Sequence, residues 1–290
     1  MLSLLKHNCL SDDMSIECFE SPYRYYVINN LFNAETYEQL CNDFHRRIHG
    51  VPRYCDLPNP VSTYTGIIKG VAEKQLTRGY DFFASDTWKE FNSKYFGLPL
   101  TNYMSINDHF HKAPGQVGHS HTDFAVCHFK RHQYIDSNDY CTDYDHQKPD
   151  SVYYARSIAM LYYFNNSPQF EGDGGTDVLD NFESFNGKVI RTVPATNNSV
   201  FVFEITRKSY HRFAGSTFDR HAMVSWFHSS PAFMLHRNLE DTKNYYKTFN
   251  QVFDRWNREV PAWKINLDPE FKSVFGDKSK EVEEYFGWTS

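Results

Sequence analysis

The chain has 290 residues, with 30 lysines and arginines against 36 aspartates and glutamates, so its formal net charge is −6 when the 14 histidines are neutral. A mildly acidic chain without a long basic run lacks the clustered positive charge that nucleic-acid binding requires, and its apolar stretches are too short to span a membrane. Aromatic residues make up 17% of the chain and hydrophobic residues 40%, so we expect a folded core rich in aromatic rings.

The N-terminus and the cysteines both favour a cytoplasmic protein. The apolar residues 1–5 are followed at once by Lys6 and His7, which does not fit a signal peptide. Six cysteines lie far apart without a C-x-x-C pair, which predicts free thiols and no zinc ribbon; they are Cys9, Cys18, Cys41, Cys55, Cys127 and Cys141.

The first hundred residues read as a strand followed by helices. Residues 24–28 (RYYVI) predict a strand, and a helical apolar spacing follows Asn33, which is a suitable N-cap. A second amphipathic helix is predicted between Ser85 as its cap and Gly97 as its stop.

Residues 104–227 change to short β-branched and aromatic runs divided by Gly, Pro and Asn: SIAMLYYF, GGTDVL, KVIRTV, NSVFVFEI and AMVSWF. Many short strands at close intervals are typical of a sandwich or barrel. We interpret Gly174-Gly175 as a tight turn or bulge. Beyond Pro231 the apolar spacing predicts a helix with the face Tyr245, Phe249, Val252, Phe253 and Trp256.

One His-x-Asp triplet stands out, His121-Thr122-Asp123, in the segment GQVGHSHTDF. On an extended chain His121 and Asp123 point to the same side and can share one metal ion. A remote His211 follows the strand NSVFVFEI, and Arg220 opens the next strand. Two histidines and one carboxylate form the facial ligand set of non-haem Fe(II) oxygenases, which leaves three positions open.

These pieces resemble the Fe(II)- and 2-oxoglutarate-dependent dioxygenases, in the prolyl-hydroxylase-like branch. The likeness covers residues 22–228 and rests on PYRYYVINNLFNAETYEQL, HTD, ARSIAMLYYFNN, GDGGTDVL, VPATNNSVFVF, and His211 with Arg220 and AMVSWF. It implies a mainly β fold with flanking helices, a double-stranded β-helix of the jelly-roll or cupin type. Its cofactors would be Fe(II), 2-oxoglutarate as co-substrate and O2, with ascorbate as a candidate reductant.

The resemblance also assigns roles to individual residues. His121, Asp123 and His211 would be the catalytic iron ligands, and Arg220 would bind the distal carboxylate of 2-oxoglutarate, which suits the guanidinium fork. The Tyr163 hydroxyl would donate a hydrogen bond to the same carboxylate. If the strand register is wrong by one residue, Tyr162 would take this role instead.

The domain organisation that follows is one structural domain. Residues 1–100 are expected to supply the N-terminal strand and helices, and residues 101–230 the catalytic core. Residues 124–155 would form a lid inserted in that core, and residues 231–290 a C-terminal helical extension. No repeat or linker divides the chain.

The lid suggests the substrate. Residues between Asp123 and Arg156 are polar, Tyr-rich and poor in strand alternation, so we expect a loop or a small excursion over the metal. A lid suits a small molecule, and its cations suit a carboxylate; the candidate substrate-binding residues are His128, Lys130 and Arg131. We therefore expect a small, amino-acid-like metabolite that is hydroxylated, desaturated or cyclised with release of succinate and CO2. The oligomeric state is not predicted.

Four alternatives remain open. A prolyl or peptidyl hydroxylase is favoured by the branch resemblance. His119, His121 and Asp123 also give most of the H-x-H-x-D-H motif of metallo-β-lactamase-like zinc hydrolases, but Phe124 stands where that motif needs His. A jelly-roll binding module without catalysis is the third. The fourth is that the proposed ligands have no metal role, because each of them, taken singly, could be an ordinary loop, sheet or surface residue. This region is also rich in other histidines, most of which are expected to be solvated or hydrogen-bonded and not metal ligands: His109, His111, His119, His128, His132 and His146.

Overall fold

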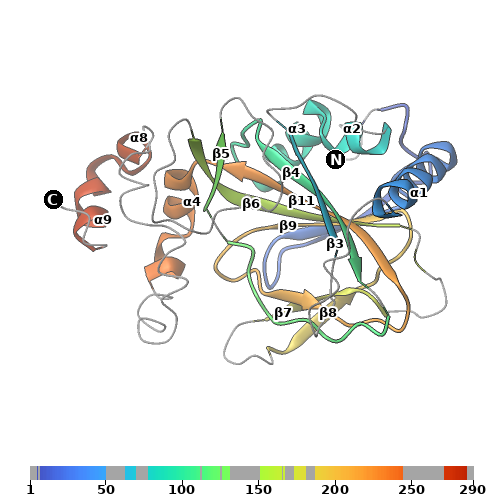
Figure 1. The fold of residues 1–290 in the computed structure, drawn as a ribbon. Coiled ribbons are helices and arrows are strands. Elements are labelled where there is room, and N and C mark those ends of the chain that lie inside the picture. Colours follow the sequence, from blue (N-terminus) through green and yellow to red (C-terminus); the bar gives the residue numbers. More distant parts are fainter. Residues whose placement is uncertain are drawn as a thin grey trace.

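The computed structural model describes residues 5, 7–49, 63–69, 78–111, 113–124, 126–130, 151–164, 166, 173–180, 187–243 and 271–285. Two antiparallel sheets dominate these residues, with the small sheet below the large one in the view of Figure 1. The chain is thus mainly β with helices at its periphery, as the sequence predicts.

The large sheet is 8-stranded, in the order β1-β2-β9-β6-β11-β4-β3, and β5 also pairs with β6. Its strands are β1 (Ser15–Phe19), β2 (Tyr25–Asn29), β3 (Thr63–Lys69), β4 (Met104–His111), β5 (Val126–Lys130), β6 (Ser151–Tyr163), β9 (Ser199–Glu204) and β11 (Arg220–Ser229). The two central strands, β6 and β11, are long and β-branched or aromatic, which explains why they carry the sheet.

The small sheet has three strands in the order β10-β7-β8, with β7 (Thr176–Leu179), β8 (Val189–Val193) and β10 (His211–Phe213). The segment after β4 continues this sheet beyond β10, because Gly115 bridges Ser216 and His121 bridges His211. Gly174, with a φ of +73°, begins the turn into β7, and a Cβ at Gly175 would lie 2.3 Å from the Val193 carbonyl oxygen. The Gly-Gly pair is therefore a turn with a close backbone approach, as predicted.

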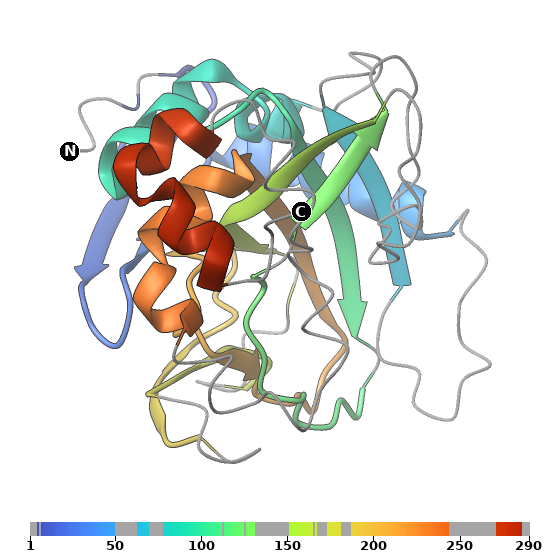
Figure 2. The same cartoon turned by 90° about the vertical axis from the view of Figure 1, so that its left-hand side faces the viewer.

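Helices α1 and α3 begin at the N-caps that the sequence predicts. The Thr36 amide donates to the Asn33 side chain at the start of α1 (Ala34–His49), and the Trp88 amide donates to the Ser85 hydroxyl at the start of α3 (Asp86–Phe96). Gly97 ends α3 in the left-handed region, with a φ of +66°. The other helices are α2 (Arg78–Phe83), α4 (Pro231–Arg237), α8 (Phe271–Phe275), the 3-10 helix η3 (Gly276–Lys278) and α9 (Ser279–Tyr285). Figure 2 shows α4, α8 and α9 together on one side of the sheets.

Aromatic rings fill the space between the large sheet and α2 and α3. Tyr162 of β6 contacts Phe32 and Phe83, each with ring centroids 5.3 Å apart, and Phe83 in turn contacts Trp88 at 5.7 Å. All four side chains are buried. The ring-rich core expected from composition thus lies on the outer face of the large sheet.

Residues 126–130 form strand β5, which pairs antiparallel with residues 151–155 of β6, so the two ends of the predicted lid at residues 124–155 are paired strands and not loop. The alternation there is too irregular for sequence to reveal the pairing. Residues 131–150 and the predicted helical face at residues 245–256 lie outside the described residues.

Cys9, Cys18 and Cys41, whose side chains the structure describes, are free thiols. None of the described helices has the length and apolar character needed to cross a membrane.

His228, near the end of β11, makes stability depend on pH. Burial and the charge of Arg156 lower its pKa to about 3, although Nδ1 lies 3.1 Å from the Tyr103 carbonyl oxygen. The unfolded chain protonates this histidine near the ordinary value of about 6.5. Between these values the unfolded state binds more protons, so the free energy of unfolding falls as pH falls.

We expect the free energy of unfolding, measured with urea between pH 6.5 and 4, to depend less steeply on pH in His228→Gln than in the parent protein. The difference in slope should be up to about 1.4 kcal/mol per pH unit. An unchanged slope in this variant would show that His228 is already protonated, or is solvated, in the folded chain.

Candidate metal and co-substrate site

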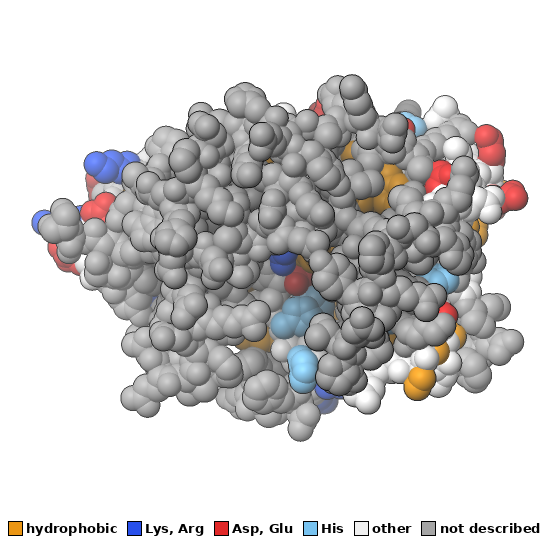
Figure 3. Space-filling model, in the orientation of Figure 1, with side chains coloured by type: hydrophobic (Ala, Val, Ile, Leu, Met, Phe, Trp, Pro, Cys, Tyr) orange, Lys and Arg blue, Asp and Glu red, His pale blue; other side chains and the backbone are white. Residues whose placement is uncertain are grey.

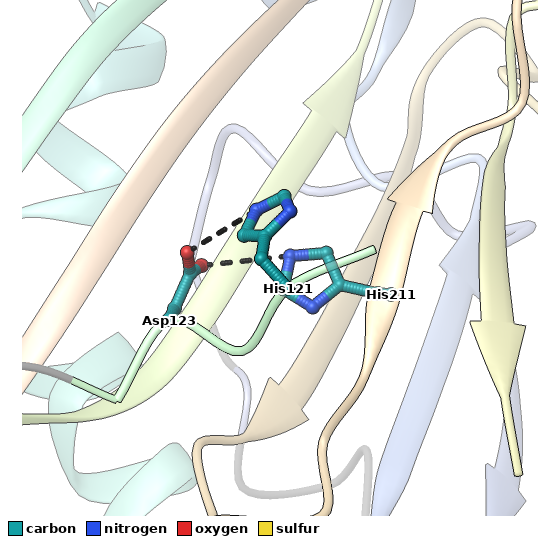
Figure 4. A group of neighbouring side chains, drawn as sticks. All are labelled: His121, Asp123 and His211. Atoms are coloured by element: carbon teal, nitrogen blue, oxygen red, sulfur yellow. Dashed lines mark ion pairs between the residues drawn. The ribbon is translucent and has the colours of Figure 1, made fainter. Parts of the chain in front are cut away.

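The three predicted iron ligands lie together. His211 is the first residue of β10, His121 ends the segment that bridges it, and Asp123 follows two residues later. Nε2 of His121 lies 3.7 Å from Asp123 Oδ1, and Nε2 of His211 lies 3.7 Å from Asp123 Oδ2. Figure 4 shows both rings directed at the carboxylate. One ligand atom from each residue lies within 4.8 Å of the other two, a separation that one ion can bridge.

Backbone pairing fixes the two histidines relative to each other. The amide of His121 donates to the carbonyl of His211 at 3.1 Å, and the amide of His211 donates back at 3.0 Å. Their ring centroids lie 4.5 Å apart. Residues directly opposite each other in an antiparallel pair present their side chains side by side, so this pairing places both imidazoles against one point in space.

Carbonyl groups set the tautomer of both rings. Nδ1 of His121 lies 2.8 Å from the His119 carbonyl oxygen, and Nδ1 of His211 lies 3.0 Å from the Ser209 carbonyl oxygen. Since a carbonyl oxygen only accepts, each Nδ1 carries the proton and each Nε2 keeps a lone pair for a metal. Burial lowers the pKa of His211 to about 4, which also keeps that ring neutral.

Asp123 is held ionised by its neighbours. Burial raises its pKa, but positive charge on His211, His121 and Arg156 and a hydrogen bond from Trp226 outweigh burial and hold the pKa below its ordinary value. When both imidazoles are neutral, Arg156 and Trp226 are the groups that still stabilise the carboxylate. The Trp226 indole Nε1 donates to Oδ2 at 2.9 Å, and Arg156 Nη1 lies 4.0 Å from Oδ1.

Sequence reasoning gave no role to Trp226 or Arg156. Alternation along β11 predicts that Trp226 shares a face with Arg220, so its place could have been found. The place of Arg156 could not have been found, because a bulge turns its side chain to the other face of the sheet. Ile158 pairs with Phe227, but Arg156 pairs with the next residue, His228, so residue 157 has no partner on β11. The extra residue between them re-aims the strand, and the Arg156 guanidinium lies 4.2 Å from the Trp226 ring centroid.

Arg220 and Tyr163 lie together on the same inner face. Arg220 is buried, and its guanidinium carbon is 5.1 Å from the ring centroids of both Tyr163 and Phe213. The Tyr163 hydroxyl pairs with the Thr176 hydroxyl at 2.7 Å, whereas Tyr162 reaches the opposite face and bonds Asn198 at 2.9 Å. Ala222, a small residue two positions after Arg220, is the cross-strand partner of Tyr163. The predicted choice of Tyr163 over Tyr162 as the inward residue agrees with this register.

His109 and His111 of β4 face the same interior, since they pair with Ala222 and Arg220. Burial and the Arg220 charge lower the pKa of His109 to about 3. His111 stacks on Phe213 with ring centroids 4.2 Å apart, and both of its nitrogens are buried without a hydrogen-bond partner among the described residues. His111 is thus neither solvated nor hydrogen-bonded within the described residues, and it is not in the described group of residues that can share one ion.

Other predicted residues take no part in the described cluster. His119 is exposed and contributes its carbonyl oxygen, not its ring. His128 and Lys130 lie in β5, but their side chains are outside the described residues, as is all of Arg131, so their role in substrate binding stays a prediction.

The donor set fits Fe(II). Two imidazole nitrogens and one carboxylate oxygen would hold the ion, and this combination of donors suits Fe(II) and leaves coordination positions for other ligands. The His121 side chain is 47% exposed while those of His211 and Asp123 are 7% and 11% exposed, so the site opens to solvent on the His121 side. Figure 3 shows acidic, basic and histidine side chains together near the centre of the face of the molecule that it draws.

Trp226 should matter for metal affinity, because its indole fixes the carboxylate that the metal needs. We expect Trp226→Phe to weaken Fe(II) binding about tenfold, the lower range for loss of an outer hydrogen bond to a ligand. Anaerobic titration with Fe(II) measures this, and Tyr162→Phe, which loses a hydrogen bond on the other face of β6, serves as the control. Equal affinities in Trp226→Phe and the parent protein would remove Trp226 from this role.

No family model matches the chain, and no curated protein matches it. Among solved structures, a prolyl-4-hydroxylase from Pseudomonas putida has a TM-score of 0.47 at 13% identity, covering 70% of this chain and 91% of that chain. A prolyl hydroxylase from Trichoplax adhaerens, in complex with a hypoxia inducible factor peptide fragment, has a TM-score of 0.47 at 15% identity, covering 70% and 83%.

The non-heme alpha-ketoglutarate-dependent epimerase SnoN from nogalamycin biosynthesis has a TM-score of 0.44 at 10% identity, covering 71% of this chain and 76% of that chain.

Proposed function

We propose that this chain is an Fe(II)- and 2-oxoglutarate-dependent oxygenase. The observation that carries the proposal is the convergence of His121, Asp123 and His211 within 4.8 Å, with both Nε2 atoms directed at the carboxylate. The buried guanidinium of Arg220 lies in the same interior. It supplies the positive charge that the distal carboxylate of 2-oxoglutarate would need.

The strand arrangement supports a jelly-roll core. β4, β11, β6 and β9 are neighbours in the large sheet, and residues 115–121, β10, β7 and β8 are neighbours in the small sheet. The chain therefore passes between the two sheets several times, which is the double-stranded β-helix pattern that the resemblance implies. The iron ligands lie where the segment before β5 meets β10.

Each residue has a defined task in this proposal. His121, Asp123 and His211 would hold Fe(II), and Trp226 orients the carboxylate of Asp123. Arg220 and Tyr163 would pair with the distal carboxylate of 2-oxoglutarate by charge-assisted hydrogen bonds. The buried ring of Phe203 lies 4.6 Å from the His211 ring and shields this side of it from water.

When bound, Fe(II), 2-oxoglutarate and O2 supply the oxidation itself, in which 2-oxoglutarate becomes succinate and CO2 and a C–H bond of the substrate is oxidised. We propose a small carboxylate-bearing metabolite as the substrate. A peptide, of the kind bound in the Trichoplax structure, is the second candidate. The zinc hydrolase alternative needs His119 as a ligand, but His119 is not in the described group of residues that can share one ion.

Removing one ligand should abolish the reaction. We expect His211→Ala and Asp123→Ala each to lose Fe(II)-dependent release of succinate from 2-oxoglutarate, while circular dichroism stays that of the parent protein. His119→Ala is the matched control from the same H-x-H-x-D segment and should keep the parent rate. Activity retained in His211→Ala, or lost in His119→Ala, would contradict the proposed ligand set.

The co-substrate site gives a separate prediction. Arg220→Gln should raise the dissociation constant for 2-oxoglutarate about 10- to 150-fold, the equivalent of losing a charge-assisted hydrogen bond worth about 1.5–3 kcal/mol. Binding is measured anaerobically on the Fe(II) protein by the charge-transfer absorption of the chelated 2-oxo acid. An unchanged constant would mean that a different cation holds the distal carboxylate.

A further inference from the structure

His111, the last residue of β4, is an imidazole in the interior of the protein. The residue is 4% exposed, and neither of its ring nitrogens has a hydrogen-bond partner within the described part of the chain. Burying a polar group without a partner costs stability, so buried polar side chains are almost always hydrogen-bonded. An imidazole that the described residues leave unsatisfied in this place therefore points to a ligand.

His111 lies beside the candidate co-substrate cation. It is directly opposite Arg220 in the pairing of β4 with β11, and residues opposite each other in an antiparallel pair present their side chains to the same face of the sheet. The His111 ring stacks on Phe213 with centroids 4.2 Å apart, and the guanidinium carbon of Arg220 lies 5.1 Å from the centroid of the same ring. The imidazole and the guanidinium thus share one aromatic neighbour.

Strand β11 lies between β4 and β6, so Arg220 has neighbours on both sides. On the β6 side, the Tyr163 ring centroid lies 5.1 Å from the guanidinium carbon, and the Tyr163 hydroxyl pairs with that of Thr176 at 2.7 Å. On the β4 side lies His111. The two oxygens of a carboxylate accept about four hydrogen bonds in all, of which a guanidinium fork supplies two. A carboxylate paired with Arg220 would therefore have positions left for a donor on each side.

The His111 ring is a neutral donor held in one plane. Burial, followed by the charges of His109 and Arg220, holds the pKa of His111 far below its ordinary value. A neutral imidazole keeps one N–H, so His111 can donate a hydrogen bond without placing a second positive charge beside Arg220. Stacking on Phe213 fixes the plane of the ring, and the N–H lies in that plane at the edge of the ring.

We propose that His111 is a third binding residue for the co-substrate, and that its ring N–H donates a hydrogen bond to the distal carboxylate of 2-oxoglutarate, beside Arg220 and Tyr163. The inference rests on the proposed oxygenase function and adds a residue to its co-substrate site. It has a consequence for stability that a structural histidine would not have. Because the described part of the chain gives the ring nitrogens no partner, removing them should weaken co-substrate binding without destabilising the ligand-free protein.

The test compares two 2-oxo acids on the Fe(II) protein without oxygen, by the same charge-transfer absorption. 2-Oxopentanoate keeps the C1 carboxylate and the keto group of 2-oxoglutarate but lacks the distal carboxylate. We expect His111→Phe, which keeps a ring to stack on Phe213, to bind 2-oxoglutarate at least about tenfold more weakly than the parent protein. 2-Oxopentanoate should not distinguish the variant from the parent. His111→Gln, which keeps an N–H donor, should bind 2-oxoglutarate with an intermediate affinity.

Thermal melting of the ligand-free protein gives the second readout. His111→Leu is measured together with His111→Phe, because leucine is closer to histidine in volume, and we expect at least one of the two to melt no lower than the parent protein. The affinities are compared in the variant that meets this condition. His236→Phe is the matched control, since His236 also contacts a phenylalanine ring, Phe275 at 5.3 Å, but lies on α4. It should bind 2-oxoglutarate like the parent protein.

Three results would overturn the inference. The first is a parent-like affinity for 2-oxoglutarate in the apolar variant of His111. The second is an equal loss of 2-oxopentanoate and 2-oxoglutarate, because His111 would then act on the metal or on the shape of the site and not on the distal carboxylate. The third is a lower melting temperature in both apolar variants, which would show a structural partner. In each case the parent protein still binds 2-oxoglutarate and the proposed function stands, whereas a parent protein that does not bind it would contradict both.

Discussion

The pair of backbone hydrogen bonds between His121 and His211 is the constraint on which the site depends. It joins the segment after β4 to the edge of β10 and so brings two distant parts of the chain to one point. Asp123 follows two residues later and meets both imidazoles because this pairing fixes where the segment ends. The carbonyls of His119 and Ser209 then set the tautomers, so a few backbone groups decide both the position and the protonation of the ligands.

The two faces of the large sheet have different tasks. The outer face packs aromatic rings against helices and supplies the core, as the contacts of Tyr162 with Phe32 and Phe83 illustrate. The inner face carries buried polar groups, which are costly unless they are paired. The neighbouring residues Tyr162 and Tyr163 divide between these faces, so one strand serves stability with one residue and the candidate co-substrate site with the next.

Local patterns in the sequence were sufficient for much of this structure. Caps at Asn33 and Ser85 and the period of the β-branched runs predict the elements, and the His-x-Asp triplet with a remote His predicts the ligand cluster. What sequence missed depends on pairing between distant strands. Alternation counted back from Tyr163 places Arg156 on the outer face, and only the bulge at residue 157 reverses that assignment. The pairing of β5 with β6, which contradicts the predicted loop, is likewise a long-range feature.

We propose that His121, Asp123 and His211 hold one Fe(II) ion. Anomalous X-ray diffraction at the iron edge, from crystals grown with Fe(II) and 2-oxoglutarate without oxygen, would locate the metal. We expect a single iron peak bonded to Nε2 of both histidines and to the Asp123 carboxylate, with 2-oxoglutarate extending from it toward Arg220. An iron peak at His119 or elsewhere, or none at the three ligands, would show that these residues do not form the iron site.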